Sequence, residues 1–140
     1  MMSERRIAIA ANGINIIAKL NQSMTADALW NALPITATVQ IWGDELYFST
    51  PVDAPDEDVQ ETVNRGAVAY WPPGQALCLF WGPTPMSRGD EIRPASPVNI
   101  LGHIESEPKE LGQIPAGSEI TVRQVRESRT EDPARTGAEN

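Results

Sequence analysis

The segment Tyr70–Pro85 reads YWPPGQALCLFWGPTP and places an apolar run between two breaks rich in proline and glycine. Proline removes a backbone hydrogen-bond donor and fixes φ, so Pro72-Pro73-Gly74 and Gly82-Pro83 interrupt a strand ladder. The residues between the breaks, Ala76 to Trp81, are all apolar, which is typical of a buried strand. This segment therefore predicts the centre of a β-rich core.

The N-terminal region predicts a β-hairpin. Asn12-Gly13 separates the apolar stretches Arg5–Ala11 and Ile14–Leu20, and both residues tolerate the positive φ that a two-residue hairpin turn requires. In the second stretch apolar residues recur at every second position, which predicts one core-facing side.

A short amphipathic helix follows the hairpin. Thr25 stands at the expected N-cap, and apolar residues then recur at helical spacing until Pro34 ends the pattern. A helix this short is unstable alone in water, so its apolar stripe must pack on the sheet. Trp30 offers the largest apolar area for that contact.

The remaining pattern predicts short strands. We expect them at Thr36–Trp42, Glu45–Ser49, Ala67–Tyr70, Ala76–Trp81, Val98–Ile104 and Glu119–Val125. A short helical turn is expected at Pro108–Leu111, between the last two strands. Many short strands with one early helix favour a closed barrel over a parallel α/β sheet. We predict a mainly β protein with a closed antiparallel barrel, capped by one or two short helices.

The length of 140 residues fits one domain, predicted over residues 1–126, with 127–140 as a disordered polar tail. The net charge of −8, without a basic stripe, argues against nucleic acid or an anionic membrane as a partner. No apolar run approaches the roughly 20 residues of a bilayer span. With Cys78 as its only cysteine the chain cannot form an intrachain disulfide, and we expect a buried thiol in a cytoplasmic protein.

Few residues fit the known schemes of catalysis. His103 is the only histidine, so triads and zinc sites lack partners, and we predict neither a metal nor a cofactor. Asp44 and Glu45 are adjacent and point to opposite faces of a strand, which is poor geometry for a carboxylate pair. The acidic segment Asp53–Glu61 lacks the spacing of a calcium loop and predicts a solvated loop, with room for one helical turn.

A binding site is the remaining hypothesis. The aromatic candidates are Trp42, Tyr47, Tyr70, Trp71 and Phe80, although core packing is the alternative for each of them. Trp71 is the best candidate for exposure, because the following prolines hold it extended at a strand end.

The long connection at residues 82–97 and the strand after it supply polar candidates. Arg93, Ser96 and Asn99 could donate hydrogen bonds to a ligand carboxylate or a peptide backbone. A surface salt bridge is an equal alternative for Arg93. Long loops on a rigid scaffold often carry binding groups. Arg88-Gly89-Asp90 in this connection is interpreted as a plain turn.

Three motifs together resemble those of small prokaryotic cyclophilin-like proteins. They are YWPPGQALCLFWGPTP, WGDELYFSTPV (Trp42–Val52) and EIRPASPVNILG (Glu91–Gly102). The shorter signatures are PASPVN, inside the third motif, and TPM, which ends at Met86 just after the first. The resemblance spans Ile7 to about Val125. It implies a barrel capped by the helix near Trp30, with a groove where cyclophilins hold an X-Pro peptide.

The sequence departs from cyclophilins at the positions that the resemblance brings to the groove. No arginine stands between Thr36 and Tyr47, Ala76 and Cys78 replace a glutamine and an aromatic residue, and Val98 lies near the expected histidine. We therefore carry over no catalytic residue. The hypotheses are a binding module for a small metabolite or short peptide, an atypical prolyl isomerase, and a protein interaction or assembly module, with a homo-oligomer possible.

Overall fold

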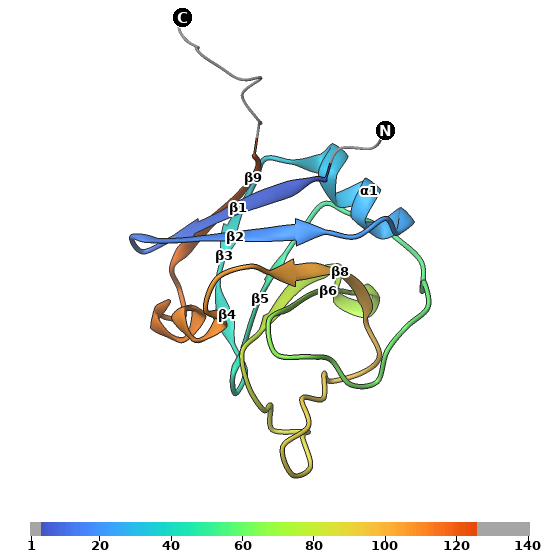
Figure 1. The fold of residues 1–140 in the computed structure, drawn as a ribbon, viewed down its shortest axis with the longest axis vertical. Coiled ribbons are helices and arrows are strands. Elements are labelled where there is room, and N and C mark those ends of the chain that lie inside the picture. Colours follow the sequence, from blue (N-terminus) through green and yellow to red (C-terminus); the bar gives the residue numbers. More distant parts are fainter. Residues whose placement is uncertain (1–3, 126–140) are drawn as a thin grey trace, which may run out of the picture.

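Nine strands form one antiparallel sheet in the order β3-β9-β1-β2-β8-β6-β7-β5-β4 in the computed structural model, which describes residues 4–125. The two end strands of this order follow each other in the chain with Val39 alone between them, so the sheet curls into a nearly closed barrel (Figure 1). The predicted mainly β barrel is confirmed. The strands are β1 Arg6–Ala11, β2 Ile14–Leu20, β3 Ile35–Thr38, β4 Gln40–Ile41, β5 Glu45–Ser49, β6 Ala67–Trp71, β7 Ala76–Phe80, β8 Asn99–Ile104 and β9 Glu119–Gln124.

The predicted N-terminal hairpin is confirmed. Asn12 and Gly13 have φ values of 51° and 79°, and β1 pairs with β2 in the register Arg6↔Lys19 to Ala11↔Ile14. In β2 the residues Ile16, Ala18 and Leu20 are buried, as the two-residue period predicts. Both the strand register and the burial pattern thus match the hairpin predicted from the sequence.

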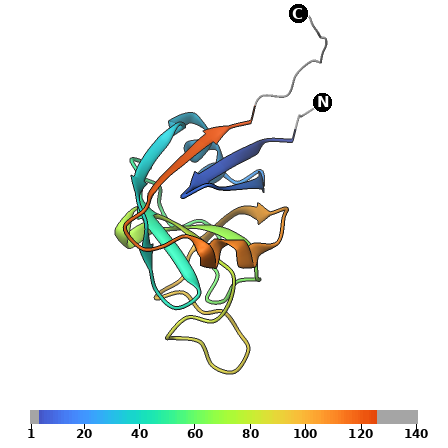
Figure 2. The same ribbon diagram turned by 90° about the vertical axis from the view of Figure 1, so that its left-hand side faces the viewer.

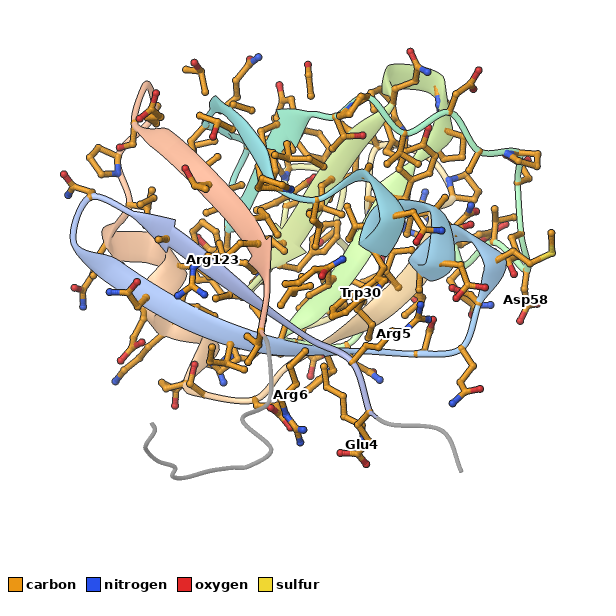
Figure 3. All side chains as sticks on the ribbon, turned by 90° about the horizontal axis from the view of Figure 1, so that it is seen from above. Glu4, Arg5, Arg6, Trp30, Asp58 and Arg123 are labelled. Carbon is orange, nitrogen blue, oxygen red and sulfur yellow. The ribbon has the colours of Figure 1, made fainter. Side chains whose placement is uncertain are left out.

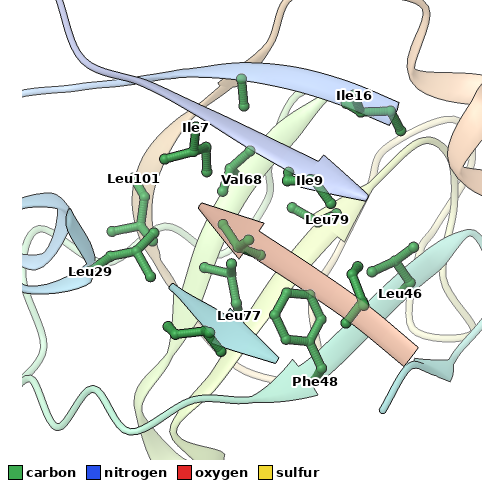
Figure 4. Packing of buried hydrophobic residues seen from close by; sticks show 14 of the residues in the cluster. Ile7, Ile9, Ile16, Leu29, Leu46, Phe48, Val68, Leu77, Leu79 and Leu101 are labelled. Atoms are coloured by element: carbon green, nitrogen blue, oxygen red, sulfur yellow. The ribbon is translucent and has the colours of Figure 1, made fainter. Parts of the chain in front are cut away.

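The barrel interior is filled by aliphatic side chains together with Phe48 and Tyr70, and Figure 4 shows part of this packing around Phe48. Leu77 and Leu79 of β7 point into this interior cluster, whereas Cys78 and Phe80 of the same strand belong to a second cluster. The second cluster, which we call the outer cluster, lies on the outside of the sheet. Every residue of β7 is buried, because each of its faces packs against a different cluster.

Helix α1 spans Met24–Ala32, with Ser23 rather than the predicted Thr25 as its N-cap. The Ser23 hydroxyl accepts a hydrogen bond from the Ala26 amide at 3.0 Å. The Thr25 hydroxyl instead donates to the Glu57 carboxylate at 2.6 Å. The prediction misplaced the cap by two residues because Ser and Thr are both good capping residues and tertiary contacts decide between them.

Helix α1 packs its apolar stripe on the core as predicted, with Trp30 at the edge of the contact. Ala26 and Leu29 of α1 are fully buried in the interior cluster, whereas Trp30 is half-buried at its edge. The Arg5 guanidinium lies 5.7 Å from the centroid of the Trp30 ring, and the two side chains are neighbours in Figure 3. A cation over the exposed ring face accounts for this partial burial.

Two 3₁₀ helices complete the described chain. η1 at Pro72–Gly74 joins β6 to β7, and η2 at Pro108–Gln113 confirms the predicted helical turn. The acidic segment at 53–61 forms a loop without a helical turn, and the 82–97 connection extends away from the barrel (yellow in Figures 1 and 2). No helix within residues 4–125 combines the length and apolarity needed to cross a bilayer. The tail predicted at 127–140 lies outside the described residues.

Strand β8 contains a bulge on its β6 side and a close backbone approach on its β2 side. Its pairing with β6 shifts between Val68↔Gly102 and Ala69↔Ile100, so Leu101 is the extra residue, and its side chain enters the interior. A Cβ atom at Gly102 would lie 2.2 Å from the Lys19 carbonyl oxygen. Only glycine fits at this position.

We expect Gly102→Ala to lower the free energy of unfolding by about 3 kcal/mol, because β2 or β8 must shift to remove the clash. Urea denaturation measures the change. Gly89→Ala is the control, since a Cβ there meets no atom within 4 Å and only the positive φ of 63° is strained. Equal midpoints for Gly102→Ala and the wild type would contradict the close approach.

Candidate functional site

A cavity of about 270 Å³ lies on the outer face of the barrel, between strands β5 to β7 and the end of the 82–97 connection. Three aromatic side chains line it: Trp42 from the β4–β5 turn, Tyr47 from β5 and Trp71 from the end of β6. All three are half-buried. We call this space the outer cavity.

Strand geometry places the other lining residues. Glu45 precedes Tyr47 by two positions and so shares its face, and Tyr47 lies directly opposite Cys78 on β7. The Trp42 amide donates to the Glu45 carbonyl at 2.9 Å, which closes the turn and brings the Trp42 ring to the same side. Opposite the sheet, the wall consists of Pro94, Ala95 and Val98.

The Trp71 side chain is held from two sides. Its indole Nε1 donates to the Ser96 hydroxyl at 2.6 Å. Its ring lies against the backbone of Gly74, where a Cβ atom would stand only 2.5 Å from the ring. Ser96 therefore positions Trp71, and the aromatic wall is fixed by the protein itself.

Glu45 is the unusual group in the outer cavity. Its side chain belongs to a residue that is only 5 % exposed, and its Oε1 is the one buried side-chain oxygen or nitrogen within residues 4–125 that has no hydrogen-bond partner. Burial raises the pKa of Glu45 to about 7, and the neighbouring Cys78 thiol opposes this only in part. The carboxyl can thus gain or lose a proton near neutral pH.

Cys78 is the buried thiol that its apolar run predicts. Burial, and then the nearby Glu45 carboxylate, raise the pKa of Cys78 well above its ordinary value. The thiol therefore stays protonated, and its side chain forms part of the cavity lining.

The sequence pattern of the cyclophilin-like family matches residues 5–123. The chain belongs to the cyclophilin-like family. A hypothetical protein from Archaeoglobus fulgidus, known from a solution structure, is 37% identical to it, with a TM-score of 0.74 over 87% of this chain and 95% of the archaeal one. No curated protein matches this chain.

Two of the predicted aromatic residues lie away from the outer cavity of this cyclophilin-like chain. Tyr70 is buried in the interior cluster, where its hydroxyl donates to the Val52 carbonyl at 2.7 Å and accepts from the Ala54 amide at 3.2 Å. Phe80 is fully buried in the outer cluster. Both side chains pack against protein, which is the alternative that the sequence leaves open for each aromatic residue.

Two of the predicted polar residues also have structural partners. Arg93 forms ion pairs with Glu91 at 2.8 Å and Glu61 at 3.7 Å, which is the surface alternative. Asn99 is buried, accepts from the Glu57 amide at 2.9 Å and donates to the Thr25 hydroxyl at 3.0 Å. The structure thus brings together Trp42, Tyr47 and Trp71 in the cavity, with Ser96 behind Trp71.

Glu45 is not among the site residues that the sequence predicts. Paired with Asp44 it has poor geometry, but by itself it lines the outer cavity. A usable signal exists in the alternation of GDELYF, which puts Glu45 on the face of Tyr47 beside an entirely apolar strand. Pro94, Ala95 and Val98 carry no such signal, because the fold of the 82–97 connection determines where they lie.

A larger hollow of about 480 Å³ is lined by polar residues, His103 among them. Two of its polar side chains have structural partners: Asn21 donates to the Ile100 carbonyl at 2.7 Å, and Glu57 accepts from the Met24 amide at 2.9 Å at the start of α1. Within residues 4–125 no cluster of three or more His, Cys, Asp or Glu side chains is arranged to hold a metal ion. The outer cavity is therefore the stronger candidate site.

Replacing Asn99 by Ala is expected to reduce the free energy of unfolding by about 2 kcal/mol, because the buried Thr25 hydroxyl and Glu57 amide lose their partner. A thermal melt measures the loss. Gln60→Ala serves as the control, because the exposed Gln60 side chain donates only to the nearby Asp58 carbonyl. A melting temperature as high as that of the control would argue against this role for Asn99.

The raised pKa of Glu45 makes a second prediction. A carboxyl whose pKa rises from 4.5 to about 7 on folding stabilises the fold below pH 4.5, and this contribution is lost as the pH rises through 7. Glu45→Gln does not titrate there. As the pH rises from 4.5 to 8, we therefore expect the unfolding free energy of the wild type to fall relative to that of the variant, by on the order of 3 kcal/mol. Urea titrations at several pH values measure the difference, and a constant difference would refute the shift.

Proposed function

We propose that this cyclophilin-like domain is a binding module that accepts a small molecule or the side chain of a short peptide in the outer cavity. The observation that supports the proposal is the aromatic wall made by Trp42, Tyr47 and Trp71, which faces a concave space of about 270 Å³. Concave, mostly apolar sites with a few polar groups are the usual form of ligand sites.

The support of Trp71 favours binding over simple packing. A side chain that only fills a core is held by its apolar neighbours, whereas Trp71 is also fixed by a 2.6 Å hydrogen bond from its indole to Ser96. A half-buried aromatic ring that is already fixed before the ligand binds loses less conformational entropy on binding. The cavity is therefore suited to a ligand that it meets without large rearrangement.

The lining supports binding better than catalysis. Its thiol is kept protonated by burial, and Glu45 is its single carboxyl. Arg93 directly precedes the lining residue Pro94, but its guanidinium pairs with Glu91 and Glu61. An isomerase would need a donor directed at the amide that rotates, so the binding module is the function that we propose.

The four tryptophans of the chain provide the test. Trp42 and Trp71 line the outer cavity, whereas Trp30 belongs to α1 and Trp81 borders a different hollow. In ¹H–¹⁵N NMR spectra each indole N–H gives its own signal. A screen of cationic, neutral and anionic fragments and short proline peptides is expected to yield ligands that shift the Trp42 and Trp71 signals and leave the other two in place.

Trp71→Ala is expected to weaken such a ligand at least tenfold, a loss typical of a central aromatic contact. Arg93→Ala is the matched control from the 82–97 connection and should leave the affinity unchanged, because its guanidinium is directed to acidic side chains. Ligands that shift only the Trp30 or Trp81 signals, or a Trp71→Ala variant that binds like the wild type, would disprove the proposal.

A further inference from the structure

We infer that the ligand of the outer cavity is a cation, a compact organic ammonium with an apolar body whose N–H donates to Oε1 of Glu45. This inference rests on the proposed function and adds to it the chemical class of the ligand. It depends on the geometry of Glu45, on the aromatic walls and on the charges around them.

The first support is the unpaired carboxylate oxygen. Oε1 of Glu45 is buried without a hydrogen-bond partner, although nearly all buried polar atoms in proteins are paired. An unpaired buried acceptor is costly to the fold, and a charged donor would form the strongest hydrogen bond available to it. The oxygen belongs to a residue that lines the cavity, so a ligand there can supply the donor.

The aromatic walls favour the same class of ligand. The faces of tryptophan and tyrosine rings attract cations, most strongly where water is excluded. Trp42, Tyr47 and Trp71 line the same cavity as Glu45, so a bound ammonium would meet both a carboxylate and ring surfaces. Recognition of ammonium groups by aromatic side chains is a recurring arrangement in proteins.

The surrounding charges exclude the opposite class. The titratable groups that face Glu45 in the cavity are the Tyr47 phenol and the Cys78 thiol, and neither is a cation. Asp44 is its neighbour in the turn, and the Arg93 guanidinium is neutralised by Glu91 and Glu61. The net charge of −8 draws cations toward the surface and repels anions.

The volume limits the size of the ligand. The cavity volume of about 270 Å³ lies just below the usual range for ligand sites, roughly 300 to 1,000 Å³. The cavity therefore suits an amine attached to one ring or a short aliphatic chain, and the flat apolar wall of Pro94, Ala95 and Val98 would cover its body.

The test compares three probes of one shape, benzylamine, benzyl alcohol and benzoate, at pH 8, with the Trp42 and Trp71 indole signals as the readout. We expect benzylamine to bind at least tenfold more tightly than benzyl alcohol, and benzoate to bind most weakly. Glu45→Gln should remove the preference for the amine and keep the affinity for the alcohol. Glu119→Gln, which removes one exposed charge on β9, is the matched control and should keep the preference.

A pH series on the wild-type protein gives an independent measurement that requires no variant to fold. Because the pKa of Glu45 is raised to about 7, protons compete with the ammonium below that pH. The affinity for benzylamine should fall by about tenfold per pH unit there, while that for benzyl alcohol stays constant.

The outcomes separate the two proposals. If benzyl alcohol or benzoate binds as tightly as benzylamine, or if Glu45→Gln keeps the preference, the ligand class is wrong and the binding module stands. A benzylamine affinity that does not change with pH overturns the ligand class as well. If none of the three probes shifts the Trp42 and Trp71 signals up to its solubility limit, the ligand class is wrong, and the binding module fails as well if the wider fragment and peptide screen also leaves both signals in place.

Discussion

The structure depends on the burial of strand β7 on both of its faces. Leu77 and Leu79 complete the barrel interior, while Cys78 and Phe80 anchor the outer cluster. A closed barrel normally leaves the outside of its strands to water, so an apolar outer face needs its own cover. The 82–97 connection supplies it, and this requirement explains why such a long irregular segment is retained.

The outer cavity follows from how that cover is built. Ile92 and Val98 close over the outer cluster beside Phe80, whereas Pro94 and Ala95 stand off from the sheet at Glu45 and Tyr47. Strand β5 already pairs with β7 on one side and β4 on the other, so this part of the connection covers its outer face and adds no strand to it. The cavity is thus the space left between the outer face of the sheet at Glu45 and Tyr47 and the segment that covers it.

How far the sequence predicts this protein depends on the range of the interactions involved. Local rules find the Asn12-Gly13 hairpin and the doubly buried β7, because turn chemistry and continuous apolar composition are encoded within a few residues. Ser23 replaces Thr25 as the helix cap because Glu57 and Asn99, distant in sequence, engage the Thr25 hydroxyl. For the aromatic residues, alternation shows that neighbours point to opposite faces, but not which face a covering segment leaves open. Tyr70 and Trp71 are both aromatic candidates in the sequence, yet Tyr70 is a core residue and Trp71 lines the cavity.

Glu45 connects the stability of the fold to its proposed role. Selection for stability alone would favour Gln or an apolar residue beside Cys78, since a carboxyl without a partner destabilises the fold when it ionises. Positions where a sequence violates the rules of core packing are most often functional. The Glu45 side chain lines a cavity that also has three aromatic walls, so the cost of its burial coincides with a surface suited to a ligand. A bound ammonium would offset that cost, which gives one physical reason both for the acid and for the rings around it.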